Sequence, residues 1–183
     1  MTRQEALTIL HTLTKSESLL RHARSVELVM EQYAQKLGED PEEWATAGLL
    51  HDADYEMHPE QHPAVVVELL RDMGENKIAH AISAHYTKWG APYLTLLDRA
   101  LVAADELTGF IIACSQVRPD RIEGLEVKSV LKKLGQKSFA ASVDREEVYQ
   151  GADLLGVNLE EHIAFIIEVL RTHKEELRLG RQI

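Results

Sequence analysis

The fold is most clearly marked by the stretch from residue 41 to residue 52, which reads PEEWATAGLLHD. A proline in the first turn fits a helix start, because the missing N–H has no partner there in any case. Trp44, Ala47 and His51 then recur at intervals of three and four, which places them on one face of a helix. The stretch therefore predicts a helix over 41–52 whose inward face ends on a histidine, with Asp52 beside it.

Helical periodicity extends over nearly the whole chain, and the alternation typical of strands is scarce. Capping residues followed three positions later by a carboxylate mark several helix starts, and glycines mark several ends. We expect an all-α, single-domain helical bundle that spans residues 1–183. The predicted helices, about eight in number, cover 3–13, 17–37, 41–52, 61–73, 75–87, 93–114, 126–134 and 144–177, the last broken near Gly156.

The composition excludes several classes of protein. The formal net charge is -10, so the chain repels phosphate backbones and we expect no nucleic-acid backbone as a partner. The single cysteine, Cys114, leaves no disulfide within the chain and no Cys-rich zinc site. No apolar run approaches the roughly 20 residues of a membrane helix, and the first residues do not resemble a signal peptide. We expect a cytoplasmic protein with no membrane partner, and the oligomeric state stays open, a homodimer included.

Residues of metal-ligand type occupy positions where the helical pattern calls for apolar ones. They lie on five different predicted helices: His22, His51, His62, His85 and Asp105. Asp105 is the clearest, because an unpaired carboxylate among apolar neighbours needs a cation or a strong donor. A single histidine on an apolar face is usually a hydrogen-bonded core residue, but this set can be satisfied together by one cation. The pattern therefore predicts a metal site.

The same helical periodicity predicts, for each helix, the inward-facing stripe of residues that packs in the core. On the fourth predicted helix the inward residues are His62, Val66, Leu69 and Met73. On the fifth they are Ile78, Ile82 and His85, followed by Trp89, and on the sixth the stripe begins with Leu94 and Leu97. His51 and Asp52 differ by about 100° around their helix, so they can hold one ion from two sides at the helix edge.

The order His22, His51-Asp52, Asp105 resembles the HD-domain superfamily of metal-dependent phosphohydrolases. The segments Ala47–Asp52 and Ala103–Glu106 are similar to its central and last motifs. The resemblance covers a metal-binding core at about 17–115, and a C-terminal helical extension over about 116–183 resembles that of small bacterial HD hydrolases. It implies a helical bundle that holds a divalent metal and hydrolyses a phosphate ester or anhydride.

His62 and His85 resemble the extra histidines of HD proteins with two metals, which implies a second ion bridged by Asp52. Tyr86 stands where some two-metal relatives have a further histidine, and this argues against a cyclic-dinucleotide phosphodiesterase. Imidazole and carboxylate ligands without thiolate suit Mn, Fe, Co, Ni or Zn, in one or two ions. Such a metal lowers the pKa of a bound water molecule.

Candidate catalytic groups lie close to this pattern. Asp52 could bind the metal and orient the water, and Asp54 or Glu56 could serve as general base or as a partner of a ligand. The alternative for the last two is a solvated acidic loop. The candidate cations for a substrate phosphate are Lys128 and Lys132, in the main basic cluster, and Arg21 and Lys88, close to predicted ligands. A solvated helix face is the alternative for the two lysines of the cluster.

We predict a metal-dependent phosphohydrolase that acts on a small phosphorylated metabolite or nucleotide. Two alternatives stay open at this point. A di-iron oxygenase on the same scaffold could use His62 and His85, and a non-catalytic helical interaction module could have lost its metal.

Overall fold

The computed structural model describes residues 1–181, and every regular element among them is a helix. The all-α prediction is therefore confirmed. The chain forms two compact units, the first from Met1 to Val102 and the second from Ala103 onward. The predicted domain also includes residues 182 and 183, which lie outside the described part. No helix in the described part is both long and apolar enough to cross a membrane.

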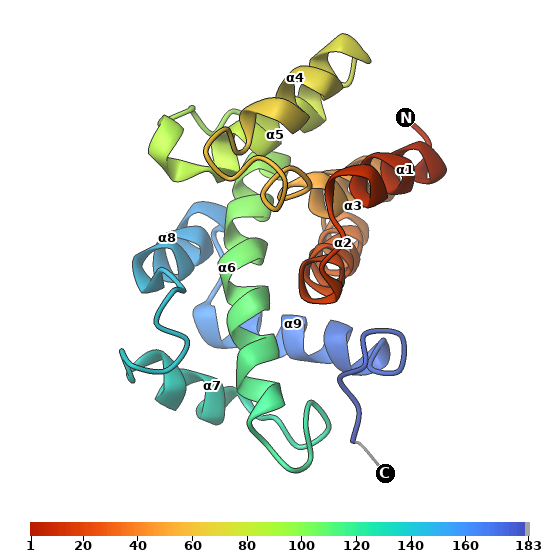
Figure 1. Cartoon of the computed structure of the whole chain (residues 1–183). Coiled ribbons are helices and arrows are strands. Elements are labelled where there is room, and N and C mark those ends of the chain that lie inside the picture. The colour runs from red at the N-terminus through yellow and green to blue at the C-terminus, as the bar shows by residue number, and fades with distance from the viewer. Residues whose placement is uncertain (182–183) are drawn as a thin grey trace. The chain divides into compact units, whose positions relative to one another are not determined.

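The helices follow one another along the chain as coloured in Figure 1. The first unit contains α1 (Arg3–Leu13), α2 (Glu17–Leu37), α3 (Pro41–Leu50), α4 (Ala64–Asp72), α5 (Asn76–His85) and the 3-10 turn η1 (Thr87–Trp89). The long helix α6 (Leu96–Gln116) begins in the first unit and continues into the second. The second unit also contains α7 (Val127–Leu134), α8 (Arg145–Leu155) and α9 (Leu159–Thr172).

The helix starts are fixed by the capping residues that the sequence predicts. Thr2 and Glu5 form a reciprocal capping box at the start of α1. Asp40, Asp144 and Asn158 each accept hydrogen bonds from two backbone amides at the starts of α3, α8 and α9. These side chains satisfy amides that have no partner within their own helix, so the helices begin where the caps stand.

Gly48 sets the distance between α2 and α3. A Cβ atom at this position would lie 2.8 Å from the carbonyl oxygen of Val26, closer than real Cβ contacts. The two helices can therefore pack this tightly because residue 48 has no side chain. His22 lies four residues before Val26, and His51 lies three residues after Gly48, so each histidine shares a helix face with the contact. The close packing of α2 on α3 thus brings the two histidines together.

The inward stripe that we predict for the fourth helix is partly wrong. Leu69 and Met73 are 37% and 43% exposed, whereas the buried residues of α4 are Val66, Val67 and Leu70. The difference follows from where the helix begins, because a start at residue 61 gives the pattern the wrong phase.

Pro63 explains the later start of α4. A proline disfavours the helical conformation of the residue before it, so His62 stays outside the helix and α4 begins at Ala64. Two further predicted core residues also lie outside regular α-helix. Leu94 precedes α6 and is 67% exposed, and Trp89 lies in η1 and is 45% exposed.

Candidate metal centre

Two of the predicted ligands are oriented by the last turn of their own helices. The Nδ1 atom of His51, at the end of α3, lies 2.7 Å from the carbonyl oxygen of Gly48. The Nδ1 atom of His85, the last residue of α5, lies 2.6 Å from the carbonyl oxygen of Ile82. A carbonyl oxygen can only accept, so both Nδ1 atoms donate a proton. In the neutral ring, each Nε2 atom then offers a lone pair to a metal.

His62 is oriented by a buried carboxylate instead. Its Nδ1 atom lies 2.7 Å from Oδ1 of Asp54, and Oδ2 of Asp54 accepts the backbone N–H of Val66 at 3.0 Å. Asp54 is completely buried, so the alternative of a solvated acidic loop does not hold for this residue. Its carboxylate joins His62 to the first turn of α4.

Asp52 places one oxygen toward each of two histidine pairs. Its Oδ2 atom lies 3.5 Å from Nε2 of His51 and 4.0 Å from Nε2 of His22. Its Oδ1 atom lies 3.3 Å from Nε2 of His62 and 3.6 Å from Nε2 of His85. The Asp52 side chain is 24% exposed, whereas His51 is completely buried. Solvent therefore reaches the side chains of Asp52 and of His22, which is 18% exposed, more than those of the buried histidines.

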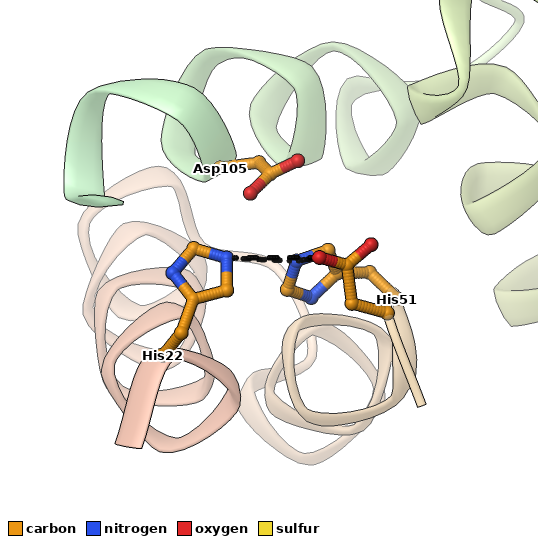
Figure 2. Close-up of side chains that lie close together, drawn as sticks. His22, His51 and Asp105 are labelled. Atoms are coloured by element: carbon orange, nitrogen blue, oxygen red, sulfur yellow. Dashed lines mark hydrogen bonds and ion pairs between the residues drawn. The ribbon is translucent and has the colours of Figure 1, made fainter. Parts of the chain in front are cut away.

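The cluster contains two groups of potential ligands that share Asp52. In the first group the Nε2 atoms of His22 and His51 lie 3.2 Å apart, and Figure 2 shows the two rings turned toward each other. The second group consists of Asp52, His62 and His85, and within each group the ligand atoms lie within 4.8 Å of one another. Asp105, half-buried on α6, lies in the second unit, and its role as a ligand stays a prediction. The first unit alone supplies the other five predicted ligands to these two groups: His22, His51, Asp52, His62 and His85.

The donor set fits a divalent transition metal. At least three imidazole rings have their protonated nitrogen committed to a protein acceptor, and their other nitrogens converge on a carboxylate. Lone pairs and carboxylate oxygens at this distance repel one another unless a cation lies among them. Imidazole and carboxylate without thiolate are ligands for Mn, Fe, Co, Ni or Zn. The cluster could hold such an ion.

Glu56 lies at the surface and connects the loop to α2. Its Oε2 atom accepts the backbone N–H groups of Lys15 and Ser16 at 2.7 and 2.9 Å. These two hydrogen bonds lower the pKa of the Glu56 carboxyl below its ordinary value. The carboxylate thus anchors the loop after α3 to the start of α2. Its predicted role as a general base stays a prediction.

The four predicted phosphate-binding residues lie in different surroundings. Arg21 is half-buried on α2, next to His22, and Lys88 lies in η1 with its Nζ atom 5.5 Å from the centre of the Tyr86 ring. In the second unit, Lys128 is exposed and pairs with Glu126 at 2.8 Å, and Lys132 lines a cavity of about 260 Å³. Their roles in binding a substrate stay predictions.

Aromatic residues beside His62 are the part of the site that sequence reasoning misses. The ring centre of His62 lies 5.4 Å from that of Tyr55 and 5.2 Å from that of Tyr86. Tyr86 in turn contacts Trp89, with ring centres 6.1 Å apart. Both tyrosines lie outside regular α-helix, where hydrophobic periodicity gives no signal.

Comparison with known proteins agrees with this geometry. The HD domain family matches residues 19–109. A protein named Ribonuclease Y, from Chloroflexus aurantiacus, is 28% identical over 166 residues, which cover 83% of this chain and 32% of the relative. The chain thus spans about a third of the length of that relative. No solved structure matches the present chain. The matched segment contains all six predicted ligands, and the chain belongs to the HD-domain superfamily.

Proposed function

We propose that this protein is a metal-dependent phosphohydrolase that acts on a small phosphorylated metabolite or nucleotide. Its membership in the HD-domain superfamily supports metal-dependent hydrolysis as the class of reaction. The similarity to a protein named as a ribonuclease is in keeping with chemistry at a phosphate ester. The observation that carries the proposal is the position of Asp52, with one carboxylate oxygen directed at each of two histidine pairs.

The shared carboxylate favours two ions. One would be held by His22, His51 and Asp52, and the other by Asp52, His62 and His85. We assign the remaining position at the first ion to Asp105, because its carboxylate follows an apolar stretch of α6 and lies within the HD match. Metal ions bound here supply Lewis acidity and lower the pKa of a water molecule, so that hydroxide is available near neutral pH.

The chain's own residues have distinct roles in this proposal. Asp52 would contribute one oxygen to each group of ligands and, because its side chain is reached by solvent, would orient the attacking water. Asp54 is a positioning residue, because both of its oxygens are engaged by His62 and by the backbone of Val66. Glu56 fixes the loop through its bonds to the start of α2. Asp54 therefore has neither oxygen available to remove a proton while these bonds persist, and the proposed role of Glu56 as a general base would have to use its Oε1 atom.

The charge of the protein favours a small substrate over a polynucleotide. A net charge of -10 repels an extended phosphate backbone, whereas one or two phosphate groups need only local cations. We propose Lys88 and Arg21 for this role, because both are neighbours in sequence of residues in the cluster.

Elemental analysis of the purified protein, followed by a phosphatase screen with the metals found, tests the proposal. We expect Mn, Fe, Co, Ni or Zn in the protein, and release of phosphate from at least one class of small phosphate ester. Asp52→Ala, which removes the carboxylate that both groups share, should abolish both properties, while Asp153→Ala, at an exposed position of α8 in the second unit, serves as the matched control. Metal-loaded protein that releases no phosphate from any ester or anhydride would overturn the assignment.

A second function is favoured by the same shared carboxylate. Two irons, one on each group of potential ligands, the second of which contains His62 and His85, could activate oxygen, because the histidine-carboxylate donor set suits iron. Oxygen uptake by the iron-loaded protein, without release of phosphate, would identify an oxygenase. Release of phosphate with manganese, which does not depend on oxygen, would identify a hydrolase.

A further inference from the structure

Three aromatic side chains form a continuous group next to the second set of potential ligands. Tyr55 and Tyr86 both contact the ring of His62, and Tyr86 contacts Trp89. All of these residues lie in the first unit. We call Tyr55, Tyr86 and Trp89 the aromatic rim. His62 connects it directly to Asp52, since Nε2 of His62 lies 3.3 Å from a carboxylate oxygen of Asp52.

Two of the three residues of the aromatic rim are exposed to an extent that core packing does not explain, and the third, Tyr86, is half-buried. Tyr55 is 50% exposed and Trp89 is 45% exposed, whereas Trp44, the other tryptophan, is 1% exposed. Met57, in the same loop as Tyr55, is 55% exposed. Large apolar side chains gathered at the surface beside a polar site are typical of a ligand-binding surface.

The geometry of the ring contacts bears on how a planar ligand could bind at the rim. The planes of Tyr55 and Tyr86 are inclined to that of His62 by 87° and 81°, and those of Tyr86 and Trp89 by 85°. These are edge-to-face contacts, in which an edge of one ring meets its neighbour, so none of these pairs is stacked in parallel. A planar ring from outside can therefore stack on the rim without displacing an existing stack.

The ammonium group of Lys88 places a positive charge next to the rim. The Nζ atom of Lys88 lies 5.5 Å from the centre of the Tyr86 ring, and Lys88 is exposed. A flat apolar surface beside a cation matches a ligand that has a planar ring and a negative charge. Phosphate esters of aromatic compounds, nucleotides among them, have both features, whereas phosphorylated sugars and polyols lack the ring.

We propose that the aromatic rim binds the planar ring of the substrate, so that the enzyme selects phosphate esters that carry an aromatic ring, such as a nucleobase. This inference rests on the proposed phosphohydrolase function, which it narrows to a class of substrate. Stacking on exposed aromatic side chains is sequence-tolerant and contributes substantially to the binding of bases. The rim therefore selects the class of ring and leaves the choice among bases to other contacts.

Binding of a ring without a phosphate tests the rim apart from hydrolysis. Adenosine is titrated into metal-free protein while tryptophan fluorescence is followed, and Trp89 reports because Trp44 is buried. We expect saturable quenching that Tyr55→Leu and Tyr86→Leu weaken by about 10-fold in affinity. Tyr149→Leu is the control, since Tyr149 is 47% exposed on α8 in the second unit. Quenching that does not saturate, or that all three variants leave unchanged, would overturn the proposal.

The kinetic test compares a nucleoside monophosphate with glycerol phosphate. Trp89→Leu should lower the ratio of kcat/KM for the nucleotide to that for glycerol phosphate by about 10-fold, through KM. An unchanged ratio would overturn the role of the rim while leaving the phosphohydrolase intact. Saturable quenching by adenosine in a protein that hydrolyses no phosphate ester would instead overturn the proposed function and leave the ring-binding surface in place.

Discussion

Asp52 is the residue on which both groups of potential ligands depend. Each of its oxygens lies within 4.0 Å of histidine Nε2 atoms on a different side of the cluster. Asp52→Ala should therefore lose the metal from both groups, whereas His51→Ala removes a ligand from the first group. Both variants should lose most of the activity and remain folded, because helix packing does not require the ions. Metal content and circular dichroism check this, and full metal occupancy in either variant would contradict the ligand assignment.

Asp54 acts on the site through His62. Asp54→Asn keeps the size of the side chain but replaces one acceptor oxygen with an amide group that donates. We expect weaker metal binding at the group containing His62 and His85, by about 10- to 100-fold, the usual effect of losing such a partner. Titration of metal-free protein with Mn measures it.

The first group of ligands should keep its affinity in this variant. Glu56→Gln is a suitable control, because Glu56 is an exposed carboxylate of the same loop whose hydrogen bonds go to Lys15 and Ser16, whereas His62 is bonded to Asp54. Equal metal affinity of Asp54→Asn and the wild type at both groups would argue that the buried carboxylate does not position His62.

Among the elements, the contact of α2 with α3 is the most sensitive to a single methyl group. Gly48→Ala would place a Cβ atom 2.8 Å from the Val26 carbonyl oxygen, so the two helices must move apart. We expect a loss of about 1–3 kcal/mol in the free energy of unfolding, the usual effect of overpacking. Chemical denaturation measures the loss, and metal affinity should fall with it because His22 and His51 flank the contact.

Gly135→Ala is the matched control for this prediction. Gly135 has a φ of -71°, and a Cβ atom there would meet its nearest neighbour at an ordinary distance of 3.6 Å. The free energy of unfolding of the Gly135→Ala variant should stay close to that of the wild type. An equal effect of the two substitutions would mean that the close approach at Gly48 has no special importance.

The loop between α3 and α4 depends on pH through Glu56. The folded state lowers the pKa of this carboxyl below its ordinary value of 4.5, because the ionised form accepts two backbone amides. Its stabilising effect is therefore complete above the ordinary value and is lost as the pH falls through the lowered pKa. Wild type should melt at a higher temperature than Glu56→Gln at pH 7, and the difference should vanish in acid. A difference that grows on acidification would contradict this sign.

At the scale of the whole molecule, stability should depend on the metal. An ion that binds only the native state stabilises it by mass action, by about 2.7 kcal/mol when its free concentration is 100 times Kd. Removing the metal with a chelator should therefore lower Tm, and adding it back should restore the value. Differential scanning calorimetry measures the shift, with Asp52→Ala as the variant that should not respond. Unchanged Tm after verified metal removal would argue against a buried site.

The sequence alone predicts the helical class, most helix starts and the ligand set, because these depend on local signals. Asp40 caps α3 by accepting the amides of residues two and three positions later, and His51 interrupts an apolar helix face that can be recognised in the sequence. The start of α4 is harder to predict, since the effect of Pro63 competes with a helical pattern that continues through His62. The aromatic rim is not predictable, because Tyr55 and Tyr86 meet at His62 through tertiary packing.

Three backbone amides bonded to the loop between α3 and α4 can report on the state of the metal cluster by hydrogen exchange. The N–H of Val66 is held by the same carboxylate that orients His62, and those of Lys15 and Ser16 are held by Glu56. Such amides exchange with deuterium only when the loop opens, so their exchange rates measure how often the loop around the histidines opens. Binding of a metal to the cluster should therefore slow the exchange of these main-chain amides, although none of them touches a ligand atom or a substrate.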